Sequence, residues 1–76
     1  MAVKLLDTVV LEKDLPDYGL KPGDIGAVVE LYEPDGLEIE FVAGSGQTIA
    51  LITLTFSDVR SIAGSEILSV RSLIAA

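Results

Sequence analysis

The chain has 76 residues, with five basic and twelve acidic side chains and a net charge of −7 at pH 7. A chain of this length forms a single domain, because it buries only about 60 % of its unfolded surface and cannot support two cores. It contains no cysteine and no histidine, which excludes disulfides, thiolate and imidazole metal ligands, and the usual general base near neutral pH. We therefore expect no enzyme, no cofactor and no metal site.

The N-terminal apolar run is too short for a signal peptide because Asp7 interrupts it, and no later segment approaches the roughly 20 apolar residues that cross a bilayer. We expect a cytoplasmic protein that does not bind membranes. The acidic balance disfavours a nucleic-acid partner, since a phosphate backbone would be repelled, and it favours a basic protein partner. Solubility alone is an alternative reason for the same composition.

Strand signals follow one another at intervals of about ten residues, separated by turns rich in glycine and proline. Thr8–Leu11 is β-branched and apolar, whereas Ile25–Tyr32 and Leu37–Phe41 alternate between apolar and other residues. Thr48–Leu54 is apolar on both faces, which is typical of a strand that is covered on both sides. The pattern predicts an all-β barrel or sandwich and argues against any helical fold.

Turn residues join these strands. Glu12–Asp24 is predicted to be a long loop that ends in a type II turn, because Pro22 presets φ at one turn position and Gly23 accepts the positive φ of the next. Further turns are predicted at Glu33–Gly36 and Ala43–Gln47, and one short helical turn at Phe56–Asp58.

Alternation also predicts which face of the sheet each side chain occupies. In the strands Ile25–Tyr32 and Leu37–Phe41, every second residue is apolar and is predicted to share one face of the sheet. The other face is predicted to carry Val28, Glu30, Tyr32, Glu38 and Glu40. In the next strand Ala50, Ile52 and Leu54 are expected to point inward. That orientation leaves an apolar outward face around Leu51, which needs a cover.

The C-terminal part contains two similar pieces, Val59–Ala63 and Val70–Ile74, eleven residues apart. Between them, Ala63–Glu66 has the composition of a turn. We expect Ile67–Leu73 to form a last strand or a short helix packed on the barrel. The predicted organisation is one domain, residues 1–76, with a core at 5–62 and an extension at 63–76.

The stretches Lys4–Leu11, Asp14–Leu20 and Gly23–Tyr32 include a Leu-Pro-x-Tyr-Gly-Leu loop and a Gly-Asp-x-Gly turn. Together with Glu38–Phe41 and Thr53–Leu54, they resemble the small bacterial domain-of-unknown-function family numbered 4926. The resemblance implies a small five-stranded SH3-like barrel and no established activity. Some members of that family look like the antitoxin or immunity half of a two-gene pair.

The long loop is the first candidate for a binding surface. It contains Asp14, Asp17, Tyr18 and Asp24, and an acidic loop with one exposed aromatic ring can seat an arginine or lysine side chain. The alternative is that Tyr18 packs against neighbouring loop residues while the aspartates cap turns.

The outward face of the central hairpin is the second candidate. Glu30, Glu38 and Glu40 gather like charges there beside Tyr32. Binding of a basic surface is one reason for such an arrangement, and a solvated face that discourages sheet stacking is the other.

The first functional hypothesis is a non-catalytic protein-binding module whose acidic face holds a more basic partner. The first alternative is a structural or accessory subunit that is bound through an apolar surface, through which two copies would also form a homodimer. That apolar surface is predicted to consist of Val28, Ile49, Leu51, Ile67, Leu68 and Leu73. The second alternative, a nucleic-acid-binding barrel, is suggested by the resemblance of Gly23–Val29 to the turn of KOW-type barrels and disfavoured by the charge.

Overall fold

The computed structural model describes residues 3–74, which contain five strands, two single-turn 3₁₀ helices and no α-helix. In chain order the elements are β1 (Thr8–Leu11), η1 (Pro16–Tyr18), β2 (Ile25–Tyr32), β3 (Gly36–Val42), β4 (Thr48–Thr55), η2 (Phe56–Asp58) and β5 (Val59–Ser61). The predicted all-β class is confirmed, as are the first four strands and the short helical turn. No helix in this part of the chain is long and apolar enough to span a membrane.

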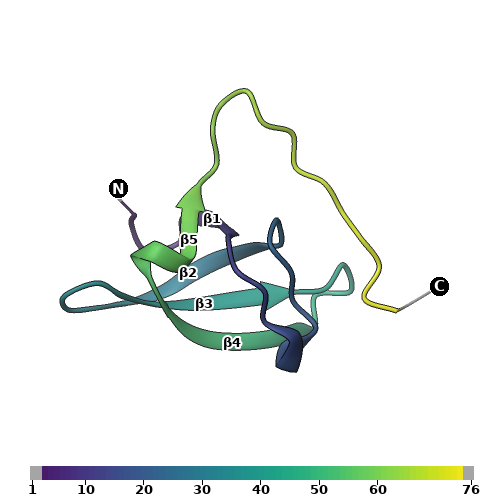
Figure 1. The fold of residues 1–76 in the computed structure, drawn as a ribbon, viewed down its shortest axis with the longest axis horizontal. Coiled ribbons are helices and arrows are strands. Elements are labelled where there is room, and N and C mark those ends of the chain that lie inside the picture. Colours follow the sequence, from purple (N-terminus) through teal and green to yellow (C-terminus); the bar gives the residue numbers. More distant parts are fainter. Residues whose placement is uncertain (1–2, 75–76) are drawn as a thin grey trace.

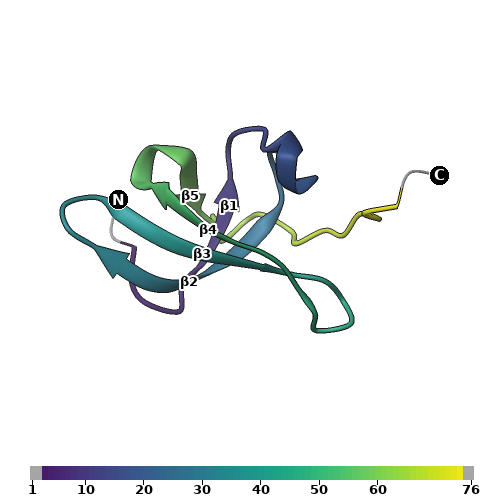
Figure 2. The same cartoon turned by 90° about the horizontal axis from the view of Figure 1, so that it is seen from below.

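The five strands form one antiparallel sheet in the order β4-β3-β2-β1-β5. β2, β3 and β4 follow one another as hairpins, and β1 lies between β2 and β5 (Figure 1). The short η2 turn connects β4 at one edge to β5 at the other, so the sheet has to curve, as Figure 2 shows. This strand order and the single-turn connection are compatible with the expected SH3-like barrel.

The turns form where their residues predict them. Before β2, the Asp24 N–H donates to the Lys21 carbonyl oxygen at 3.1 Å, and Gly23 has a φ of +97°. At η2, Thr55 and Asp58 make a capping box in which the Thr55 N–H donates to the Asp58 carboxylate at 2.9 Å. These local bonds fix the start of β2, which carries candidate residues, and the end of β4.

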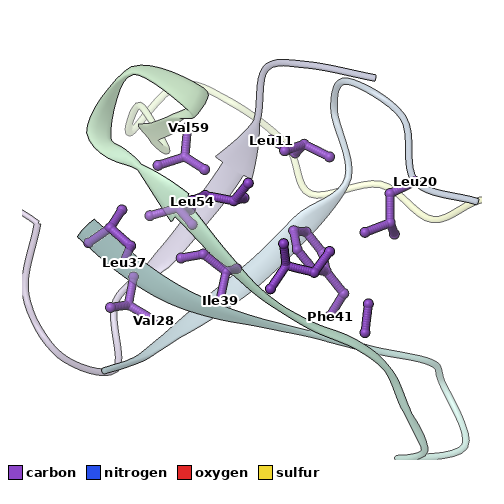
Figure 3. Packing of buried hydrophobic residues seen from close by; sticks show 11 residues of the cluster. Leu11, Leu20, Val28, Leu37, Ile39, Phe41, Leu54 and Val59 are labelled. Atoms are coloured by element: carbon purple, nitrogen blue, oxygen red, sulfur yellow. The ribbon is translucent and has the colours of Figure 1, made fainter. Parts of the chain in front are cut away.

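The core lies between the curved strands and is apolar throughout the described residues (Figure 3). Its largest fully buried side chains are Leu11, Leu37, Ile39, Val9 and Val28. They come from β1, β2 and β3, so the middle of the sheet supplies most of the interior. Burying one such side chain stabilises the fold by about 1.5–3 kcal/mol relative to exposing it.

A β-bulge in β2 changes the predicted faces of that strand. Val28 is fully buried in the core, and the register then shifts so that Glu30 lies opposite Glu38. The prediction that Val28 shares a face with Glu30 and Tyr32 is therefore wrong for Val28. The bulge places one extra residue, Val29, between the two pairings, and one extra residue reverses the alternation of a strand.

In β4 the predicted orientation is confirmed. Ala50, Ile52 and Leu54 are buried, while Leu51 is 55 % exposed on the outward face. Because β4 lies at the edge of the sheet, its outward face borders only β3 within the described part of the chain.

The prediction of a last strand or short helix at Ile67–Leu73 is wrong. The fifth strand forms at the first of the two similar pieces, Val59–Ser61, because η2 delivers this piece directly to the free side of β1. The second piece finds no neighbouring strand, and residues 62–74 contain neither helix nor strand. Leu51 stays exposed, and residues 66–69 of this tail instead line a groove together with Val10 of β1.

Gly26 in β2 allows the closest approach between strands in the core. A Cβ atom at this position would lie 2.5 Å from Cγ2 of Ile39 and 3.0 Å from Cε1 of Phe41. Both are core side chains of β3, and Glu40 contributes a carbonyl oxygen at 3.2 Å. The absence of a side chain at Gly26 therefore lets β2 cross close to β3.

We predict that Gly26→Ala destabilises the fold by about 1–3 kcal/mol, the usual effect of forcing an extra methyl group into a packed core. In a domain of this size, that loss lowers Tm by at least about 4 °C. Thermal unfolding followed by circular dichroism measures the change. Gly44→Ala is the matched control, because a Cβ there meets nothing within 4 Å, and an equal effect of both substitutions would contradict the close approach.

Candidate functional site

The structure places the candidate residues in two separate groups rather than on one surface. The outward face of β2 and β3 carries Glu30, Tyr32, Glu38 and Glu40. The loop between β1 and β2 carries Asp14, Asp17, Tyr18 and Asp24. Leu20 anchors this loop in the core, on the side of β3 opposite to the outward glutamates, and η1 projects to one side of the hairpin strands in Figure 2.

On the outward face, two glutamates are held in place by threonines of β4. The Thr53 hydroxyl donates to the Glu38 carboxylate at 2.5 Å, and the Thr48 hydroxyl donates to the Glu40 carboxylate at 2.6 Å. Glu30 lies directly opposite Glu38 on the neighbouring strand. The β2 bulge and the β4 threonines thus align three carboxylates across adjacent strands, and we call this surface the carboxylate face.

Salt bridges do not neutralise the carboxylate face within residues 3–74. The ion pairs of these residues are Lys13–Asp58, Arg60–Glu12, Arg60–Glu66 and Arg71–Asp24. All of them lie on η2, β5, the β1–β2 loop or the C-terminal tail. Both arginines of the chain are engaged there, so the negative charge of the outward hairpin face is left for solvent or a partner.

Exposed apolar side chains interrupt the carboxylates on the same face. Leu51 lies opposite Glu40, and Val42 lies opposite Thr48. Leu51, Val42 and Tyr32 are each about half exposed. A surface that combines carboxylates with exposed apolar side chains can pair with basic groups while it buries an apolar centre.

The β1–β2 loop is anchored by leucines and not by its tyrosine. Leu15 and Leu20 exchange backbone hydrogen bonds at 3.0 and 3.1 Å, and Leu20 is buried in the core. Tyr18 is 50 % exposed, so the loop covers only part of its side chain. Asp14 and Asp17 are also exposed, and no group of metal-ligating side chains large enough to hold an ion occurs in residues 3–74.

Asp24 already holds an arginine of the same chain. The Arg71 guanidinium donates to both Asp24 carboxylate oxygens, from Nε at 2.7 Å and from Nη2 at 2.6 Å, and Nη2 also donates to the Gly19 carbonyl oxygen at 2.8 Å. The Lys21 N–H donates to the same carboxylate at 2.8 Å. The hydrogen bonds from Arg71, followed by the one from Lys21, hold the pKa of Asp24 below its usual value.

A second ion pair fixes the beginning of the tail. Two guanidinium nitrogens of Arg60 donate to the two carboxylate oxygens of Glu66, each at 2.6 Å, and the Ala63 N–H donates to the same carboxylate at 2.7 Å. These hydrogen bonds, that from Arg60 above all, lower the pKa of Glu66 to about 2.

Sequence reasoning missed Arg60, Glu66 and Arg71 as members of a site. The only signal was the repeated Val-Arg-Ser piece, which placed both arginines in similar surroundings. Their partners lie as far as 47 positions away in the sequence, so spacing could not identify them.

We predict that the carboxyl group of Glu66 titrates at about pH 2 in the folded chain. Since the pKa is lowered, the contribution of the ion pair with Arg60 to folding stability is fully present above the ordinary glutamate value of 4.5 and is lost as the pH falls towards 2. Carboxyl carbon chemical shifts measured against pH report this midpoint. Arg60→Gln should move it towards 4.5, whereas the control Arg71→Gln should leave it in place; a midpoint near 4.5 in the unmodified chain would refute the pairing.

The comparisons with known proteins agree with the resemblance of the first half of the chain. The model of the family described as Domain of unknown function (DUF4926) matches residues 5–61, from before β1 to the end of β5. No curated protein and no solved structure matches the chain. The matched region contains the whole sheet and the carboxylate face, while the tail from residue 62 lies outside it. The chain therefore belongs to the family of the domain of unknown function DUF4926.

Proposed function

We propose that the chain is a non-catalytic protein-binding module whose carboxylate face holds a more basic partner protein in the cytoplasm. The observation that carries the proposal is the alignment of Glu30, Glu38 and Glu40 across β2 and β3 without a salt bridge in the described residues. The family description supplies no activity, so the proposal depends on the geometry and charge of this face.

Like charges directly opposite each other on neighbouring strands destabilise strand pairing, by up to about 1 kcal/mol relative to a neutral pair. Glu30 and Glu38 form such a pair. A partner that places lysine or arginine side chains over the two carboxylates converts this repulsion into attraction. Electrostatic complementarity of this kind raises the association rate and discriminates against acidic or neutral surfaces.

The apolar side chains beside the carboxylates add surface that a protein partner can bury. Leu51 and Val42 lie beside Glu40 and Thr48, and their exposed area can be covered by an apolar centre of the partner. Such an interface has an apolar middle and a charged rim. An antitoxin or immunity protein, which neutralises a basic protein by occupying its charged site, is the kind of module that this combination fits.

A second candidate function is supported by exposed apolar side chains of β4 and of the tail. Leu51, Ile67, Leu68 and Leu73 are all exposed, which favours a structural or accessory subunit that is bound through apolar contacts. Val28 does not belong to this surface, because it is fully buried in the core. An apolar complex keeps its affinity at high salt, whereas a complex through the carboxylate face weakens steeply.

We predict that Glu38→Lys with Glu40→Lys weakens capture of the partner at least about tenfold, which corresponds to about 1.4 kcal/mol. The tagged chain is used to capture proteins from the native lysate at low salt, and bound proteins are identified by mass spectrometry. The expected partner is basic, is lost when the salt concentration is raised, and is lost in the double variant.

The control variant carries Glu33→Lys and Asp35→Lys, which make the same change in net charge at the exposed turn between β2 and β3. This control should retain the partner, because the turn lies beyond the carboxylate face. Equal loss in both double variants would show that only net charge matters. Unchanged capture by the first variant would remove the carboxylate face from the proposal.

A further inference from the structure

The tail of the chain passes over the outside of the sheet and encloses a groove with it. Val10 of β1 and Ile25 of β2 are paired across the ladder and point away from the core, and together with Ile62 they line a shallow groove. Residues 66–69 form its other wall. Figure 1 shows the tail leaving β5 and running back towards the end of the molecule that carries η1.

The body of the domain provides one charged group of each sign for this tail. Arg60 on β5 binds the Glu66 carboxylate through two hydrogen bonds, and Asp24 before β2 binds the Arg71 guanidinium through two more. Gly19 adds a carbonyl oxygen to the Arg71 site. The groove therefore recognises an acidic side chain at one end and an arginine at the other.

The two receiving groups are fixed before any ligand arrives. Asp24 closes the type II turn, where the Lys21 N–H binds its carboxylate without any contribution from the tail. Gly19 is the left-handed residue that ends η1, with a φ of 70°. Arg60 lies in β5, which pairs with β1. Prior fixation of this kind lowers the entropy cost of binding a flexible segment.

The tail itself is held loosely between its charged ends. Ile67 and Val70 are 90 % and 99 % exposed, so their side chains contribute little to the contact. From residue 67 to residue 74 the described backbone makes no hydrogen bond to other backbone groups. The two ion pairs are therefore the main contacts that hold this part of the tail, so the tail leaves the sheet when both pairs open and returns when they form again.

We propose that the groove between Arg60 and Asp24 is a binding site for an extended peptide segment that carries an acidic residue and, five positions later, an arginine. The chain's own Glu66 and Arg71 occupy it as an internal ligand. A partner protein that presents the same two groups displaces the tail. The groove and the carboxylate face share no residue, so this site and the proposed function can fail independently.

The receptor for the test is the full chain with Glu66→Gln and Arg71→Ala, which removes both tail anchors and leaves the sheet side of the groove, with Arg60 and Asp24, unchanged. The ligand is a synthetic peptide of residues 65–74, followed by backbone amide chemical shifts of the isotope-labelled receptor. We expect shifts at residues 21–27 and 59–61, which surround the two receiving groups. The unmodified chain should bind the peptide at least about tenfold more weakly, because its own tail competes at an effective concentration in the millimolar range.

Two controls test whether the order of the glutamate and the arginine in the peptide matters, and whether Asp24 binds the arginine. A peptide in which the glutamate and arginine exchange positions should bind at least about tenfold more weakly, since each loses a charge-assisted pair. Asp24→Asn in the receptor should cause a similar loss, whereas Asp17→Asn at the exposed η1 turn should not. Dispersed amide spectra confirm that each variant is folded.

Equal binding of the original and exchanged peptides would overturn the site. So would the absence of amide shifts in the receptor at a peptide concentration several times the millimolar effective concentration of the tail. A dimer of the unmodified chain that dissociates on Arg71→Ala would support it, because the groove would then be taking the tail of a second copy.

Discussion

The structure depends on how closely β2 can approach β3. Gly26 has no side chain, and any Cβ there would collide with Ile39 and Phe41, which are core residues of the next strand. β2 also pairs with β1 on its other side, so it joins the β1–β5 part of the sheet to the β3–β4 part. The curvature that encloses the core therefore depends on this strand, and so does the register that arranges the outward face.

The same strand contains the irregularity that creates the carboxylate face. With perfect alternation, Glu30 would point to the same side as Val28, into the core. The bulge at Val29 turns Glu30 outward, opposite Glu38. An isolated buried carboxylate would be costly, and the bulge avoids that cost while it brings like charges together. The candidate site thus depends on the same irregularity of β2 that separates the buried Val28 from the outward Glu30.

Charge is divided unevenly over the molecule. The arginines form their ion pairs around β5, the β1–β2 loop and the tail, where the pKa values of Asp24 and Glu66 are lowered. The outward hairpin face has carboxylates that bind threonine hydroxyls instead. This division gives the domain two surfaces of different character: a negative outward hairpin face, and a surface of mixed charge that the tail covers.

Most of the sheet could be predicted from the sequence. Alternation and turn residues located the first four strands, the type II turn at Gly23 and the single turn of η2, because these features depend on neighbours in the chain. The outward position of Glu38 and Glu40 followed from strict alternation in β3. The acidic character of the hairpin face was likewise a property of composition.

Three features were decided only by the tertiary structure. The bulge that separates the buried Val28 from the exposed Glu30 occurs in the pairing of β2 with β3. The alternation of apolar and polar residues along β2 does not predict it. β5 forms at Val59–Ser61 and not at the similar second piece, because only the first reaches the free side of β1. Arg71 finds Asp24 across 47 positions of sequence, a contact that exists only after the loop and the tail are brought together. The sequence by itself determined the strands, the turns and the net charge, which depend on local conformation and composition; the pairing of distant groups required the folded chain.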